Sequence, residues 1–220
     1  AYAFLITHFS VDFIQSRDLH MGSTVFGLLV GLCHANRAMA LIVLVLAAFS
    51  ATPEVRRITD GGLKKNLGNL MLVDVILWAY LAFVQLLIIW MGNTRDTIEW
   101  YVQRGLNPEH FGAWTWIGGF ILVFGFFVPF LALLFTALKD RWGGLATVAG
   151  ILFISQLVQT FWFLAPSGPS DRSVFTLTWF DVVMPVAIGG IWLANFVFVL
   201  ARRPIVVRHA EPARGRPVHV

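Results

Sequence analysis

Five long apolar runs restrict what this sequence can fold into. An α-helix needs roughly 20 apolar residues to cross about 30 Å of hydrocarbon, and each run is at least that long. Charged residues make up 13% of the sequence, whereas soluble domains average about 25%. We therefore predict an all-α, polytopic membrane helical bundle with about five transmembrane helices. The predicted spans are approximately 22–50, 67–92, 113–138, 143–165 and 180–201.

The basic residues predict how the bundle is oriented. Eleven Lys and Arg residues lie between spans one and two, between spans three and four, and after span five, whereas four lie on the opposite side. Because cytoplasmic loops are enriched in Lys and Arg, we predict an N-out, C-in topology. The net charge of +4 is spread over helix ends and forms no patch, so we expect no nucleic-acid partner.

The chain divides into three segments. Residues 1–20 interleave aromatic and polar side chains, which predicts an interfacial segment on the outer face. Residues 21–203 form the transmembrane bundle, and residues 204–220 form a basic cytoplasmic tail rich in Arg and Pro. Within the third span, Pro129 predicts a kink, because proline lacks the N–H that a helix interior uses.

Asp74 is a carboxylate inside an apolar span. Charged groups in hydrocarbon are costly, so an intramembrane carboxylate is a candidate functional group. Asp74, Trp78 and Gln85 lie on nearly one helical stripe, and Tyr80 lies toward the next face. Two interpretations are open: Asp74 carries protons, or it forms a structural ion pair with Arg37 of the preceding span.

His34 and Arg37 are three positions apart, so they share a helical face of span one. They form either a proton-relay or quinone-facing pair, or a structural pair bonded to neighbouring helices. A haem held between helices usually takes two axial His ligands. Because the spans offer no second His at mid-depth, we expect no haem on this chain.

The remaining polar residues of the spans favour structural roles. Gln156, Gln159 and Thr160 form a polar strip on span four, which predicts interhelical hydrogen bonds. Asp181 begins span five, where a carboxylate stabilises a helix N-terminus. Cys33 is the single cysteine, so no cysteine cluster can hold a metal. We predict neither a metal site nor a catalytic residue.

Two ordered patterns resemble a known family. The first, D-W-x-M-S-L-x-P-H-W-x-S-T-x-F-G, aligns with residues 12–27 and the second, L-G-N-L…W-A-Y-x-x-F-x-Q-x-x-I-I-W…N…W-Y…R, with residues 67–104. These patterns are typical of the F-type membrane subunit of alternative complex III, a bacterial quinol:electron-acceptor oxidoreductase related to polysulfide reductase (NrfD-like) subunits. The matching positions are Asp12, Ser16, His20, Ser23, Thr24, Phe26, Gly27, Leu67, Gly68, Asn69, Leu70, Trp78, Ala79, Tyr80, Phe83, Gln85, Ile88, Ile89, Trp90, Asn93, Trp100, Tyr101 and Arg104, followed by Pro129, Phe130 and Lys139.

The resemblance implies a multi-pass subunit of a respiratory complex in the bacterial inner membrane. Its partners would be the lipid bilayer, a related C-type membrane subunit that oxidises the quinol, an iron–sulfur subunit and haem c subunits. Quinol (menaquinol or another), haem c and iron–sulfur clusters would sit on those partners, and this chain would bind no cofactor directly and would not be catalytic alone. It would scaffold the complex, with a candidate proton path through Asp74, Tyr80, Gln85, His34 and Arg37, and candidate quinone contacts at His20 and His34.

The sequence departs from the family pattern in span three and in span four. Gly125 to Val128 occupy the stretch where the family commonly has a His before Pro-Phe. In the outer half of span four, the acidic residue usual in the family is replaced around Gln159. Family members are also longer, with two helical bundles, and this chain matches the C-terminal one. We therefore expect a truncated or split subunit, or upstream helices supplied by sequence not shown.

Two alternatives stay open. A non-conducting assembly subunit would have a dry core around Asp74 and an ion pair between Asp74 and Arg37. The quinone-binding membrane anchor of a polysulfide- or molybdopterin-type reductase would have a cavity that opens to lipid near His34 or His20.

Overall fold

The computed structural model describes residues 1–18, 21–53, 55–56, 62–106, 111–167 and 178–202. All regular structure within these ranges is helical. The elements are α1 (Tyr2–Phe13), η1 (Gln15–Arg17), α2 (Thr24–Ala48), α4 (Leu63–Gly92), α5 (Arg95–Gln103), α6 (Ala113–Leu122), η2 (Val123–Phe127), α7 (Val128–Leu134), α8 (Thr136–Lys139), α9 (Trp142–Leu164) and α10 (Trp179–Arg202).

Five of these helical segments are long and apolar enough to cross a membrane. They are α2, α4, the continuous α6–η2–α7 segment, α9 and α10, and their bounds lie close to those of the five predicted spans. The predicted all-α polytopic bundle is therefore confirmed.

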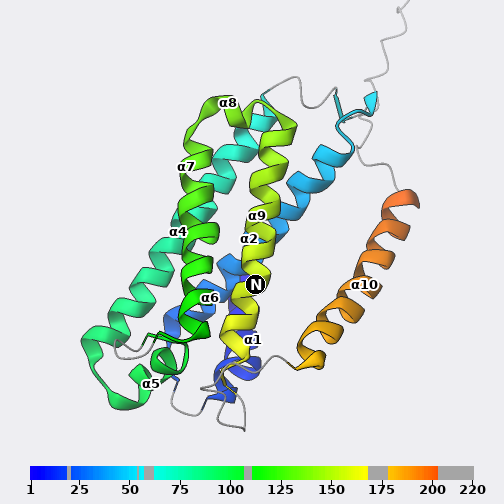
Figure 1. The fold of residues 1–220 in the computed structure, drawn as a ribbon. Coiled ribbons are helices and arrows are strands. Elements are labelled where there is room, and N and C mark those ends of the chain that lie inside the picture. Colours follow the sequence, from blue (N-terminus) through cyan, green and yellow to red (C-terminus); the bar gives the residue numbers. More distant parts are fainter. Residues whose placement is uncertain (19–20, 54, 57–61, 107–110, 168–177, 203–220) are drawn as a thin grey trace, which may run out of the picture.

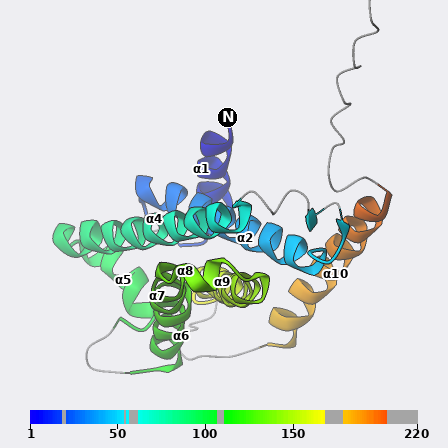
Figure 2. The same cartoon turned by 90° about the horizontal axis from the view of Figure 1, so that it is seen from above.

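Four of the five segments pack together, and α10 stands apart (Figures 1 and 2). In the packed group, α2 contacts both α4 and α9, and α7 contacts α4. No residue of α10 is buried. The short helices α5 and α8 lie at opposite ends of the bundle, which we call the α5 end and the α8 end (Figure 1). The predicted topology would place the α5 end outside the cell.

The first helix runs beside α2 rather than away from it. Ile6 of α1 lies against Gly31 of α2, and a Cβ atom at Gly27 would lie 2.9 Å from Thr7 Cγ2. Glycine in α2 thus permits close approach of the two helices. The N-terminus lies at mid-height of the bundle (Figure 1). The interfacial location predicted for residues 1–20 stays a prediction.

The predicted irregularity at Pro129 takes the form of a π-helical turn. The π-helical segment η2 precedes α7, and Pro129 lies in the first turn of α7. A proline ring clashes with the carbonyl four residues earlier in a regular α-helix, and a wider turn relieves that clash. The turn includes Gly125, where a Cβ atom would lie 2.8 Å from Ser155 Oγ of α9.

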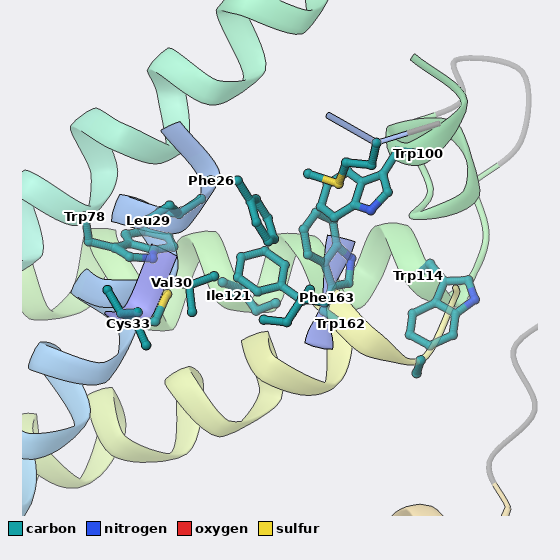
Figure 3. Close-up of a cluster of buried hydrophobic side chains, with 14 residues drawn as sticks. Phe26, Leu29, Val30, Cys33, Trp78, Trp100, Trp114, Ile121, Trp162 and Phe163 are labelled. Atoms are coloured by element: carbon teal, nitrogen blue, oxygen red, sulfur yellow. The ribbon is translucent and has the colours of Figure 1, made fainter. Parts of the chain in front are cut away.

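The bundle has two cores of different composition. The core at the α8 end contains aliphatic residues and methionine: Ala40, Val43, Met71, Val75, Leu133, Leu145, Val148, Ala149 and Leu152. The core toward the α5 end is rich in aromatic rings, with Phe26, Trp78, Trp100, Trp114, Trp162 and Phe163 among its buried members (Figure 3).

At the α8 end, Lys139 joins α8 to α4. Its Nζ donates a hydrogen bond to Asn69 Oδ1 at 2.7 Å. Its alkyl stem lies over Gly68, where a Cβ atom would approach Lys139 Cγ to 2.6 Å. The Gly-Asn pair of the second pattern thus makes room for a lysine stem and accepts its ammonium group. Nearby, Lys65 and Asp140 form an exposed ion pair at 3.5 Å, which contributes little to stability.

Candidate functional site

The five residues of the predicted proton path do not converge. Tyr80 is 61% exposed and points away from the bundle. Asp74 is half-buried on α4, and its backbone carbonyl accepts a hydrogen bond from Asn36 Nδ2 at 3.4 Å. Among the described residues no hydrogen bond or ion pair links Asp74 to His34, Arg37, Tyr80 or Gln85.

Arg37 binds α9 instead of Asp74. Its Nη1 donates to Thr160 Oγ1 at 3.0 Å, and its Nε donates to the carbonyl of Cys33 at 3.2 Å. Thr160 Oγ1 in turn donates to the carbonyl of Gln156. The ion pair of Arg37 with Asp74, one of the two interpretations above, is therefore not formed in the part of the chain described here.

The two candidate quinone contacts are His34 and His20. His34 is half-buried on α2, and its ring centroid lies 6.1 Å from that of Phe9. His20 lies outside the described residues.

Gln85 connects the two sequence patterns. Its side chain is fully buried, and its Oε1 accepts a hydrogen bond from Ser23 Oγ at 2.6 Å. Close by, the ring of Phe26 packs edge-on against Trp100 at 5.8 Å between centroids. Residues from the first pattern thus pack directly on residues from the second.

A cavity of about 400 Å³ lies toward the α5 end. Its walls come from α2, α4, α5, α6 and α9, so it is formed by helices distant in sequence. Trp78, Ile121, Trp162 and Phe163 of this wall are seen in Figure 3. The other lining residues are Leu29, Ala82, Leu86, Tyr101, Arg104, Gly105, Leu106, Thr115, Gly118, Gly119, Leu122 and Gln159.

Several buried polar atoms around this region lack a hydrogen-bond partner among the described residues. Two belong to side chains that line the cavity, Gln159 Oε1 and Trp162 Nε1, whereas the Trp78 indole interacts with the Cys33 thiol. The others are Gln85 Nε2, Ser155 Oγ, and both polar atoms of Gln156. The interhelical hydrogen bonds predicted for the strip on α9 are thus found for Thr160 but not for these atoms of Gln156 and Gln159.

Arg104 closes the cavity at the end of α9. Its guanidinium donates to the carbonyls of Trp162 and Phe163, at 3.2 and 2.8 Å, and to that of Trp100 at 2.8 Å. It also donates to Ser167 Oγ and lies 3.6 Å from the centroid of the Trp100 ring. Two of these carbonyls belong to the last turn of α9, where the helix dipole favours a cation. The side chain is therefore a cap that joins α5 to α9.

The charge of Arg104 persists at neutral pH. Burial lowers the pKa of the guanidinium to about 9, while Asp18 and Tyr101 act in the opposite direction. Burial also raises the pKa of the Tyr101 phenol, which stays protonated. Both groups thus present hydrogen-bond donors rather than a titrating pair.

No group of three His, Cys, Asp or Glu side chains in the described ranges is arranged to hold a metal ion. Cys33 is a buried free thiol. The feature that sequence reasoning missed is the cavity. Gly118, Gly119 and Trp162 were the signals available, but nothing in the sequence brings α6 and α9 together with Trp78 of α4.

Comparison of the sequence with models of known protein families gives no match, and comparison with curated proteins gives none either.

Proposed function

We propose that this chain is a membrane subunit of a bacterial quinol-oxidising electron-transfer complex of the alternative complex III type, and that its main role is to scaffold that complex. The observation that carries this proposal is the hydrogen bond from Ser23 Oγ to Gln85 Oε1, which joins the two patterns that resemble the family. This contact supports the proposal because it joins residues of both patterns, on α4 and at the start of α2.

Other matching residues have equally specific packing roles. Gly68 and Asn69 accommodate Lys139, and Trp100 stacks on Arg104, which caps α9. The patterns thus encode how the spans pack, which supports a structural role for the residues that define them.

The dispersal of the ionisable residues favours scaffolding over proton conduction. A proton path requires groups joined by hydrogen bonds or by water, and Asp74, Arg37 and Tyr80 face different surroundings. The unburied helix α10 and the exposed rings of Trp90 and Phe83 on α4 provide apolar surface for lipid or neighbouring membrane subunits.

Purification of the tagged chain from its native membrane in a mild detergent tests the proposal. We expect a second membrane subunit, haem c absorbance and iron–sulfur electron paramagnetic resonance signals to accompany it, together with quinol oxidation. Isolation of the chain alone, or with a molybdopterin protein, would contradict the assignment.

Asp74→Asn, compared with the control Tyr80→Phe, separates scaffold from conductor in the same complex. Under the scaffold proposal both variants assemble and retain quinol turnover and proton release. Loss of proton release in Asp74→Asn alone, with assembly intact, would restore the proton-path interpretation.

A further inference from the structure

The cavity toward the α5 end is built by a glycine pair. Thr115, Gly118, Gly119 and Leu122 all line it, and their spacing places them on one face of α6. A Cβ atom at Gly119 would meet nothing within 4 Å, and one at Gly118 would lie 3.7 Å from Trp162 Nε1. Larger residues at these positions would occupy the space that the glycines leave open.

The deep wall of the cavity carries polar groups that have no partner. Trp78, Gln159 and Trp162 are 4%, 3% and 9% exposed. Trp162 Nε1 and Gln159 Oε1 make no hydrogen bond with the described residues, whereas the Trp78 indole interacts with the Cys33 thiol. In a membrane interior such groups cost several kcal/mol unless something satisfies them, because no bulk water reaches them. The atoms are covered by neighbouring side chains, so a ligand would reach them through a rotamer change.

A second cavity of similar size has a different lining. It lies between α2 and α10, measures about 420 Å³ and is lined entirely by apolar residues: Leu41, Leu44, Val45, Ala48, Phe49, Leu193, Phe196, Val197, Leu200 and Ala201. The cavity toward the α5 end is also mostly apolar, but side chains with polar atoms line it as well: two indoles, a phenol, an amide and a hydroxyl. Its lining therefore favours a ring with polar substituents over a hydrocarbon chain.

We propose that this cavity binds the ring headgroup of a lipid-soluble molecule whose ring carries oxygen atoms. The Trp162 indole N–H would donate to a carbonyl-type oxygen, and Gln159 Oε1 would accept from a hydroxyl. A volume of about 400 Å³ lies within the roughly 300–1,000 Å³ of small-molecule sites. The residues described as lining the site do not include His34, and the proposal goes beyond the scaffolding role above.

Fluorescence quenching of the full chain, purified with whatever partners accompany it and placed in lipid nanodiscs, tests the site. The probes are decylubiquinone and menadione, because quinone rings quench nearby excited indoles. We expect saturable quenching that Gly119→Leu weakens by at least about tenfold, since the new side chain fills the cavity. Gln159→Leu and Trp162→Phe, which remove a polar atom but keep most of the volume, should weaken binding by a smaller factor.

Gly150→Leu is the matched control. Gly150 also lies in a spanning helix with nothing within 4 Å of its Cβ position, but it does not line the cavity. It should bind the probes like the unaltered chain. Non-saturable quenching, equal loss in Gly119→Leu and Gly150→Leu, or equal competition by decane would each overturn the proposal. Partner co-purification tests the scaffold assignment separately, so either proposal can fail while the other stands.

Discussion

The two cores of the bundle differ in the side chains that form them and in how completely those side chains fill the space. The core at the α8 end consists of aliphatic side chains and methionine that are no more than 3% exposed. The core toward the α5 end combines aromatic rings with the cavity and with buried polar atoms that have no partner in the described chain. Aliphatic close packing stabilises a fold, whereas buried polar groups without a partner lower its stability. The α8 end is therefore closely packed, whereas the α5 end is held partly by the polar Arg104 cap and leaves a cavity open.

The substitution with the largest expected effect, Arg104→Met, tests whether the α5 end also holds the bundle together. Arg104→Met would remove donors from the carbonyls of Trp162, Phe163 and Trp100, and should lower the free energy of unfolding by about 3–5 kcal/mol. Thermal unfolding in detergent measures this loss, with the exposed Arg141→Met as control. Equal stability of the two variants would mean that the Arg104 cap contributes nothing.

The aliphatic core should show the ordinary cost of a cavity. Leu145 is fully buried, so Leu145→Ala should destabilise the chain by about 3 kcal/mol. Leu134, which is 52% exposed, provides the matched control, and Leu134→Ala should change stability by less than about 0.5 kcal/mol. Denaturation of both variants by the same heating protocol checks the difference, and similar values for the two would refute close packing at the α8 end.

Gly105 tests the backbone at the rim of the cavity. Its φ is +86°, and a Cβ atom would lie 2.4 Å from the backbone nitrogen of Thr115. Gly105→Ala should therefore cost about 2 kcal/mol or more, whereas Gly112→Ala, with open space at its Cβ, should be nearly neutral. The midpoint of thermal unfolding distinguishes them; a neutral Gly105→Ala would show that the loop can move away from α6.

The smallest effect has the opposite sign. Both polar atoms of Gln156 are buried and unpartnered among the described residues, so Gln156→Leu should stabilise the chain by about 1 kcal/mol. Gln85→Leu is the control, because Gln85 Oε1 does accept a hydrogen bond from Ser23 and its removal should be neutral or mildly destabilising. Destabilisation by Gln156→Leu would instead indicate that an internal water or ligand bonds Gln156.

The sequence predicts the spans because the bilayer imposes one length and one polarity on each of them. Pro129 could likewise be recognised, since its missing N–H disturbs any helix, although one residue in the sequence does not predict that the disturbance takes a π-helical form over Val123–Phe127. Partners across helices are harder to predict. Arg37 pairs with Thr160 and not with Asp74 because helix rotation and depth decide which groups meet, and no local pattern specifies them.

The cap formed by Arg104 has a consequence for the order of biogenesis. Arg104 and the Trp162 carbonyl are 58 residues apart, with the whole third span and α9 between them. During synthesis the guanidinium can therefore reach these carbonyls only after the end of α9 has been made. The Arg104 cap at the α5 end therefore forms late. The aliphatic contacts between α2 and α4 can form before it.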